Sequence, residues 1–144
     1  MALNRALGQH ILVDLYECPA DLLNDAEAIE AALLEAAGAA GATILDAMFH
    51  RFSPHGVTGV LVIKESHIAI HTWPEFGFAA VDLFTCGDYI DPRQASDLLK
   101  TLLQAARASS VEMHRGQPDM LAGRDQDATV DPDQDQSDRS TVSK

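Results

Sequence analysis

The sequence predicts an α+β fold, a two-layer sandwich in which two main helices cover one face of an antiparallel sheet. Segments rich in β-branched residues are joined by short turns, which is typical of antiparallel hairpins. Two other segments show the apolar periodicity of amphipathic helices. Four expected strands separate these helices, an order that favours an α+β fold over alternating βαβ units. The length of 144 residues fits one domain.

The first two elements are a strand and a long helix. Residues 10–18 alternate apolar and polar side chains and predict the strand. Residues 19–41 predict the helix, which ends at a pair of glycines. Asn24 and Glu27, three residues apart, match the pattern of a capping box inside this helix.

The remaining elements follow in the order of four strands, a helix and a strand. The four strands are expected over residues 42–53, 57–65, 66–73 and 78–86. Residues 91–108 predict the second main helix, with Pro92 in its first turn. Residues 109–116 predict a short last strand, which closes a domain over residues 1–116.

Charge and composition exclude several classes of partner. Residues 117–144 are acidic and nearly free of large apolar side chains, so we expect a disordered acidic tail. The formal net charge is −12, and the excess of acidic residues within residues 1–116 argues against a nucleic-acid partner and is compatible with a small cationic substrate. No apolar run approaches the roughly 20 residues of a membrane helix, so we expect no membrane partner.

The expected location is the cytoplasm. The first residues carry no cleavable signal pattern and run directly into strand-like sequence. The two cysteines, Cys18 and Cys86, do not imply a disulfide in a reducing compartment.

The stretch VIKESHIAIHTWPEFG at residues 62–77 carries the candidate chemistry. His67 and His71 would lie on one face of a strand but roughly 13 Å apart, which is too far for both to bind one metal ion, so we expect no metal. Ser66 does not stand in the G-x-S-x-G elbow of a serine hydrolase.

A third possibility is a serine that becomes a cofactor. The hydroxyl of Ser66 would attack the carbonyl of Glu65, and the resulting ester would lose its carboxylate by β-elimination. Hydrolysis of the dehydroalanine left behind gives a pyruvoyl group. This chemistry needs a serine at a strained junction, a group that moves protons and a donor that polarises the carbonyl. His71 and Thr58, on neighbouring strands, are candidates for these roles.

The block HRFSPHGVTGVLVIKESHIAIHTWPEFGFAAVDLFTCGD closely resembles the core of prokaryotic S-adenosylmethionine decarboxylase proenzymes. The resemblance covers roughly residues 8 to 115. It implies self-cleavage between Glu65 and Ser66, which gives a β chain of residues 1–65 and an α chain of residues 66–144. Ser66 would become the pyruvoyl group that forms a Schiff base with the amine of S-adenosylmethionine. The product would be the aminopropyl donor for spermidine.

The resemblance also implies roles for further residues. His71 matches the histidine that transfers protons in self-processing, and Cys86 matches the cysteine that donates a proton in catalysis. Thr58 stands where some members of the family have serine, and threonine keeps the hydroxyl, so processing is expected to survive. The positions that match substrate-binding groups are Phe52, Trp73 and Glu75.

Plainer interpretations stand beside these roles. His67 is explained as a partly buried polar residue, Cys86 as a small core residue, Phe52 and Trp73 as core or dimer interface, and Glu75 as a turn residue. The same pyruvoyl chemistry could act on ornithine or arginine instead of S-adenosylmethionine. The chain could also be an unprocessed binding or regulatory homologue without catalysis.

Strand geometry adds two expectations. On an unbroken strand Ser66 and His71 point to opposite faces, so we expect a break at Glu65–Ser66–His67 that lets them cooperate. The strand near residues 57–64 is apolar on both faces, which predicts a homodimer that packs sheet against sheet.

Overall fold

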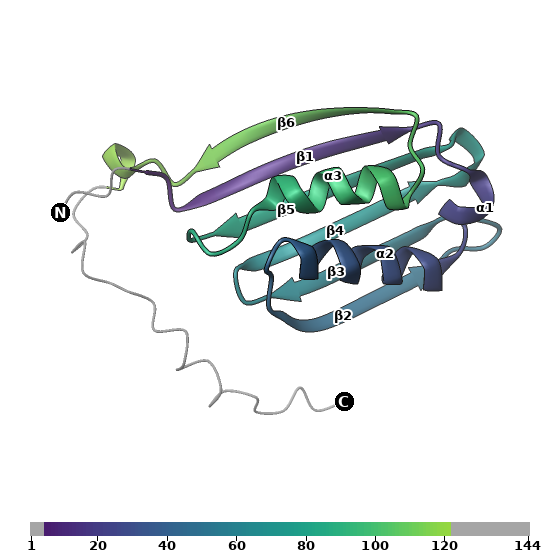
Figure 1. Ribbon diagram of the computed structural model, residues 1–144, viewed down its shortest axis with the longest axis horizontal. Coiled ribbons are helices and arrows are strands. Elements are labelled where there is room, and N and C mark those ends of the chain that lie inside the picture. The colour runs from purple at the N-terminus through teal and green to yellow at the C-terminus, as the bar shows by residue number, and fades with distance from the viewer. Residues whose placement is uncertain (1–4, 122–144) are drawn as a thin grey trace.

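The computed structural model describes residues 5–121, which form a six-stranded antiparallel sheet with helices on one face (Figure 1). The strands are β1 (Gly8–Tyr16), β2 (Ile44–Arg51), β3 (Val57–Ile63), β4 (Ser66–Trp73), β5 (Phe78–Cys86) and β6 (Arg107–Arg115). The α-helices are α1 (Ala20–Leu23), α2 (Ala26–Ala39) and α3 (Pro92–Leu102). Two short 3-10 helices, η1 (Pro74–Phe76) and η2 (Pro118–Met120), complete the elements.

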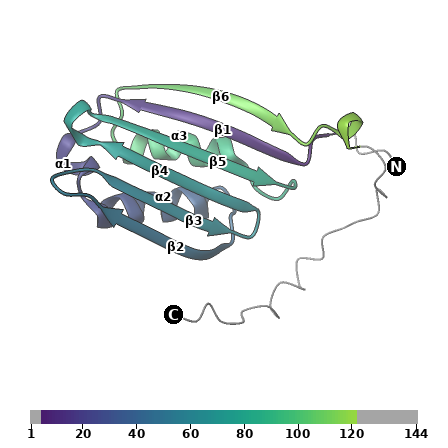
Figure 2. The same cartoon turned by 180° about the vertical axis from the view of Figure 1, so that it is seen from behind.

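The strand order is β2-β3-β4-β5-β1-β6, and every neighbouring pair is antiparallel. The two main helices, α2 and α3, lie side by side over the sheet, and the view from behind shows the other sheet face without a helix (Figure 2). The predicted α+β class, with its two-layer sandwich, is therefore confirmed.

The core lies between the sheet and the helices. Its fully buried large side chains come from β1, β3, β4, β5, α1, α2 and α3 and from the residue after α3. They include Leu15, Leu23, Ile29, Leu33, Leu61, Ile68, Leu83, Leu99 and Leu103. Burial of this apolar surface is the main force that fixes the sheet against the helices.

The structure corrects the predicted helix over residues 19–41, because two helices occupy this range. Asn24 ends α1, and its side-chain oxygen accepts a hydrogen bond from the backbone N–H of Gly56 at 3.1 Å. Asp25 is the N-cap of α2 and accepts from the N–H of Ala28 at 3.1 Å. The predicted capping box is therefore wrong, since the asparagine binds a distant turn and the aspartate beside it caps the helix.

The second main helix is shorter than predicted, because α3 ends at Leu102 and not at residue 108. Gln104 follows with a φ of 53°, and the N–H of Ala105 reaches back to the carbonyl of Lys100 at 3.0 Å. This is a Schellman ending with glutamine in the left-handed position that glycine usually takes. The last strand consequently begins at Arg107, two residues before its predicted start.

The sheet face away from the helices, called the open face below, combines apolar and polar side chains. Successive residues of a strand alternate between the two faces, and the pairing registers place Met48, Val60, Ala69, Asp82, Leu12 and Val111 in one row across the open face. Several large apolar side chains are exposed here: Met48 by 77%, Val62 by 45%, Val111 by 58% and Met113 by 49%.

Within residues 5–121, none of the helices is long and apolar enough to cross a membrane. The expected acidic tail begins at residue 117, and the structure describes its first residues, which include η2. Residues 122–144, over which most of the disorder was expected, lie outside the described part of the chain.

Candidate active site

The chain reverses direction between β3 and β4 in a two-residue turn made by Lys64 and Glu65. Ile63 and Ser66 face each other on either side of this turn. The turn is tied to the residue before β2, because the N–H of Lys64 donates to the carbonyl of Thr43 at 2.9 Å. The carboxylate of Glu65 accepts from the N–H of the same threonine at 3.3 Å. The expected break in the stretch therefore exists and falls at the predicted cleavage point.

Ser66 has a φ of 145°, a backbone conformation that residues other than glycine rarely adopt. Two-residue hairpins usually place positive φ angles inside the turn, at glycine or asparagine. Here the turn residues Lys64 and Glu65 are not among the described residues with positive φ, and the strain falls on the serine after them. Such a conformation costs about 1–3 kcal/mol and is often found at reactive positions.

The carbonyl oxygen of Glu65 accepts two hydrogen bonds from one residue of β5. The backbone N–H of Cys86 donates at 2.8 Å, and its thiol donates at 2.7 Å. Two donors aimed at one carbonyl form the arrangement that stabilises negative charge on that oxygen during attack on the carbonyl carbon. Within the chain, the hydrogen-bond donors to this carbonyl therefore come from Cys86, whereas Thr58 and His71 bond to each other.

The hydroxyl of Ser66 lies 3.1 Å from Nδ1 of His67, the next residue. The His67 ring packs against Phe84 of β5, with centroids 5.5 Å apart. Glu65, Ser66, His67 and Cys86 thus meet where β4 begins and β5 ends, and we call these four residues the cleavage cluster.

A second group of side chains surrounds His71 further along β4. The Thr58 hydroxyl and the Nδ1 of His71 share a hydrogen bond of 2.6 Å across the β3–β4 pair. The ring of Trp73 lies edge-on to His71 with centroids 4.2 Å apart, and the Phe52 ring lies 5.8 Å away. We call Phe52, Thr58, His71 and Trp73 the histidine cluster.

The structure does not bring these two clusters together within one chain. Ser66 and His71 are five residues apart on one regular strand, so their Cα atoms are about 16 Å apart. The turn separates β3 from β4 without shortening this distance. The expectation that a break would bring Ser66 and His71 together is therefore wrong for a single chain.

An aromatic cleft of about 330 Å³ adjoins the histidine cluster and is lined by Tyr16, Trp73, Phe76 and Phe78. The Trp73 and Tyr16 rings each lie 5.2 Å from the ring of Phe78. The guanidinium of Arg107 lies over the Tyr16 ring at 5.5 Å, within the range of a cation–π contact.

Glu75 forms a contact with His55, a residue of neither cluster. Its carboxylate lies 3.0 Å from Nε2 of His55, and both side chains are partly exposed. Of the predicted substrate-binding residues, Phe52 and Trp73 are thus adjacent to His71. Glu75 lies in η1, which begins directly after Trp73, and its carboxylate contacts His55 in the turn before β3.

Sequence reasoning missed four contributors, which are His67 and the cleft residues Tyr16, Phe76 and Phe78. His67 was assigned no chemical role, although its place directly after Ser66 is a signal that it can reach the hydroxyl. Tyr16 and Phe78 belong to the aromatic cleft, but they come from different strands, and only the pairing of β1 with β5 shows that they meet.

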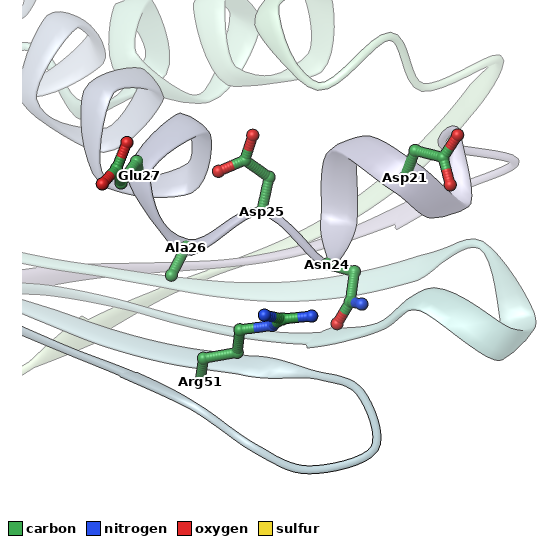
Figure 3. A pocket seen from close by; sticks show the side chains of 6 residues that line it. All are labelled: Asp21, Asn24, Asp25, Ala26, Glu27 and Arg51. Atoms are coloured by element: carbon green, nitrogen blue, oxygen red, sulfur yellow. The ribbon is translucent and has the colours of Figure 1, made fainter.

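A separate cleft lies on the helix side, between the α1–α2 connection and the end of β2 (Figure 3). Its lining is mostly polar and acidic and consists of Asp21, Asn24, Asp25, Ala26, Glu27 and Arg51. None of these residues belongs to the cleavage cluster or the histidine cluster, so this cleft is distinct from the candidate active site.

The two cysteines differ in their surroundings, and both are free thiols. Burial raises the pKa of the Cys18 thiol, which lies in the core with 5% exposure, whereas Cys86 is exposed. Residues 5–121 contain no group of three or more His, Cys, Asp or Glu side chains arranged to hold a metal ion.

Comparison with known proteins gives a consistent match. The family model described as S-adenosylmethionine decarboxylase matches residues 9–116. The S-adenosylmethionine decarboxylase proenzyme of Thermosipho melanesiensis is 52% identical over 117 residues, covering 81% of this chain and 90% of that protein. The proenzyme of the same name from Acidithiobacillus ferrooxidans is 50% identical over 117 residues, covering 81% of this chain and 88% of that protein.

A solved structure shares the fold. The crystal structure of the adenosylmethionine decarboxylase from Aquifex aeolicus matches with a TM-score of 0.75 and 39% sequence identity. The match covers 83% of this chain and 99% of that one. The family match ends at residue 116, where the expected tail begins.

Proposed function

The chain belongs to the S-adenosylmethionine decarboxylase family, and from this premise we propose that it is a proenzyme that cuts itself between Glu65 and Ser66 and then decarboxylates S-adenosylmethionine. The cut gives chains of residues 1–65 and 66–144, with the catalytic domain in residues 1–116. The relatives' printed name, proenzyme, supports a processing step.

The observation that carries this proposal is the pair of hydrogen bonds from Cys86 to the Glu65 carbonyl. Both donors strengthen as negative charge develops on that oxygen, so they favour attack by the neighbouring Ser66 hydroxyl. The positive φ of Ser66 supports the same reaction, because cleavage of the peptide bond releases the strained backbone.

The cofactor is proposed to be a pyruvoyl group formed from Ser66. The strained serine, its polarised carbonyl and the nearby histidine are the parts that its formation needs. Such a group supplies an electron sink for the electron pair left when CO2 departs. The exposed thiol of Cys86 stands beside this position and is the proposed donor of the proton that replaces the carboxylate.

A homodimer is proposed to complete the active site. The histidine cluster and the cleavage cluster lie about 16 Å apart along β4, with His71 and His67 both directed to the open face. A two-fold axis between two facing sheets, perpendicular to the strands, would place the start of one β4 over the end of the other. Although Ser66 has the opposite strand parity, its hydroxyl lies 3.1 Å from Nδ1 of His67 on the open face, so His71 and Thr58 of a second copy would then assist it from that face.

Burial of the open face supports this arrangement. The exposed apolar side chains of Met48, Val62, Val111 and Met113 all lie on that face. Packing two such faces together removes apolar surface from water, which favours association.

The substrate is a sulfonium cation that carries an adenine ring. The faces of Phe52 and Trp73 suit both parts, through cation–π attraction and stacking. Glu75, held beside His55, adds a carboxylate at the same end of β4. We take these three residues as the substrate-binding group, in an enzyme that acts in the cytoplasm and supplies the aminopropyl donor for spermidine.

Intact-mass measurement of the purified protein tests the processing step. We expect two chains that separate between Glu65 and Ser66, with a carbonyl in place of the amine at the start of the second. The Ser66→Ala variant should remain a single chain without activity. A wild-type chain that stays intact after prolonged incubation would overturn the proposal and favour an unprocessed binding or regulatory homologue.

Release of labelled CO2 tests the substrate. The processed protein should release CO2 from S-adenosylmethionine and not from ornithine or arginine. Release from either amino acid in place of S-adenosylmethionine would assign the chain to another reaction of the same chemistry.

A further inference from the structure

The serine at the cleavage point has one histidine within hydrogen-bond reach in its own chain. Nδ1 of His67 lies 3.1 Å from the Ser66 hydroxyl oxygen. His71 is about 16 Å away in the same chain, and its own Nδ1 is occupied by the Thr58 hydroxyl at 2.6 Å. A nucleophile and a base in contact, beside donors aimed at the carbonyl under attack, form the usual arrangement of acyl transfer.

We propose that His67 is the base of the first step of self-cleavage, the shift of the Glu65 acyl group from nitrogen to oxygen. This inference rests on the self-cleavage proposed above and assigns to it a residue that the family resemblance left without a role. His71 of a second copy then remains for the later elimination, in which the proton on the Ser66 α-carbon must be removed.

The proposed step balances within the cleavage cluster. Neutral His67 takes the hydroxyl proton of Ser66 at Nδ1 while the serine oxygen bonds to the carbonyl carbon of Glu65. The carbonyl oxygen becomes an oxyanion held by the N–H and thiol of Cys86. The C–N bond then breaks, and His67 passes the proton to the departing nitrogen of Ser66. The products are an ester and an amine, with no oxidation or reduction.

The His67 ring is held in place by a residue of β5, the strand that pairs with β4 on the side away from β3. Its neighbour across the β4–β5 pair is Phe84, whose ring lies 5.5 Å away. Phe84 is itself confined, because a Cβ at Gly8 would lie 2.7 Å from its ring and Arg115 covers it at 5.0 Å. A ring fixed in this way keeps Nδ1 directed at the hydroxyl, which is the orientation that a base requires.

The experiment follows self-cleavage of full-length chains made by cell-free translation. His67→Ala should cleave at least about 100-fold more slowly than wild type, which is the usual contribution of a positioned base. His67→Asn keeps a hydrogen-bond acceptor near the hydroxyl but cannot carry the proton, so it should be equally slow. His114→Ala is the matched control, because this exposed histidine lies on β6 and contacts Glu112. It should cleave at the wild-type rate.

Two further measurements separate a base from a residue that only holds the turn in shape. Added imidazole should restore cleavage of His67→Ala, because it can enter the space left by the ring and carry the proton. Hydroxylamine cuts esters but not amides, so it should leave the His67→Ala precursor intact. A precursor that hydroxylamine cuts has formed its ester without His67, and this result would overturn the proposal.

The remaining outcomes are equally decisive. Cleavage of His67→Ala within a few-fold of wild type, or of His67→Asn at the wild-type rate, would also overturn the assignment, as would a slow His67→Ala chain that imidazole leaves unchanged. A wild-type chain that never cleaves would instead overturn the proposed function, and the inference with it.

Discussion

The Cys86 thiol donates a 2.7 Å hydrogen bond to the carbonyl of Glu65, although the two residues are 21 positions apart in the sequence. The backbone N–H of Cys86 donates to the same oxygen at 2.8 Å. Pairing of β5 with β4 creates this contact, because it sets the end of β5 beside the turn that precedes Ser66. The thiol thus already contacts the proposed cleavage point in the uncut chain, although its proposed catalytic role comes only after cleavage.

Substitution of Cys86 should therefore affect cleavage as well as decarboxylation. Cys86→Ala removes one of two donors, and loss of one such donor typically slows acyl transfer by about 100-fold or more. The remaining N–H should still allow slow cleavage to completion. Cys86→Ser keeps a donor and should cleave near the wild-type rate, while a hydroxyl replaces the thiol poorly as the later proton donor. Intact-mass time courses and CO2 release measure the two steps. Normal CO2 release by cleaved Cys86→Ser would remove the thiol from the decarboxylation.

The strained backbone at Ser66 predicts that cleavage slows when the turn between β3 and β4 is given residues that favour an unstrained two-residue hairpin. The double variant Lys64→Asn with Glu65→Gly supplies the residues that favour positive φ inside a two-residue turn. Ser66 could then relax to an ordinary strand conformation, and loss of about 1–3 kcal/mol of strain corresponds to cleavage roughly 5- to 160-fold slower. The time course of chain separation measures this effect.

The matched control for that variant is Glu65→Ala. It removes the carboxylate that accepts from Thr43 without adding a residue that favours positive φ. If Glu65→Ala slows cleavage as much as the double variant does, the slower cleavage results from loss of the contact between the Glu65 carboxylate and Thr43, and not from relief of strain at Ser66.

The separation of the two clusters predicts complementation between inactive chains. Ser66→Ala lacks the nucleophile but carries an intact histidine cluster, and His71→Ala has the opposite defect. In mixed dimers of the two, the His71→Ala chain should be cut, because its Ser66 meets His71 of the other copy. Co-expression with distinguishable tags, followed by mass analysis of each chain, measures this.

The homodimer of His71→Ala is the control and should remain largely uncut. If the mixed dimer also remains uncut, although both chains fold and associate, His71 does not act across an interface. Proteins that sediment as monomers at all concentrations would contradict the sheet-to-sheet dimer itself.

The fold class was predictable because it depends on local patterns. Alternating strands and short turns are encoded within a few residues, and so is the two-residue turn at Lys64 and Glu65. The break inside the first helix was not predictable in the same way. It depends on a hydrogen bond between Asn24 and Gly56, which are 32 positions apart and meet only in the folded chain. The early end of α3 uses glutamine where the usual signal is glycine.

The candidate site shows the same limit. The E-S-H motif predicted the cleavage point, and strand parity showed before the structure was known that Ser66 and His71 would point to opposite faces of one strand. The contact of Cys86 with the Glu65 carbonyl was not predicted, because the sequence of β4 alone does not tell which strand pairs with it on the side away from β3. The register of β4 with β5 brings Cys86 to Glu65, and registers between strands are set by side chains of both.

Thr72 stands between His71 and Trp73, but we expect its substitution to change the stability of the fold and not the self-cleavage. Its side chain is 1% exposed on the helix side, where the hydroxyl accepts from the N–H of Val57 at 2.9 Å and donates to the carbonyl of Leu23 at 2.7 Å. Thr72→Val has nearly the same shape but leaves both backbone groups buried without a partner.

Loss of these two bonds should lower the free energy of unfolding by about 2–6 kcal/mol, because each unsatisfied buried group costs about 1–3 kcal/mol. Urea denaturation in the Ser66→Ala background measures this on a single uncut chain, which keeps the transition interpretable. Thr72→Ser retains the hydroxyl and should lose less stability than Thr72→Val, while both variants with Ser66 intact should still cleave. Equal stabilities for Thr72→Val and its parent would show that the hydroxyl does not connect α1 to the sheet energetically.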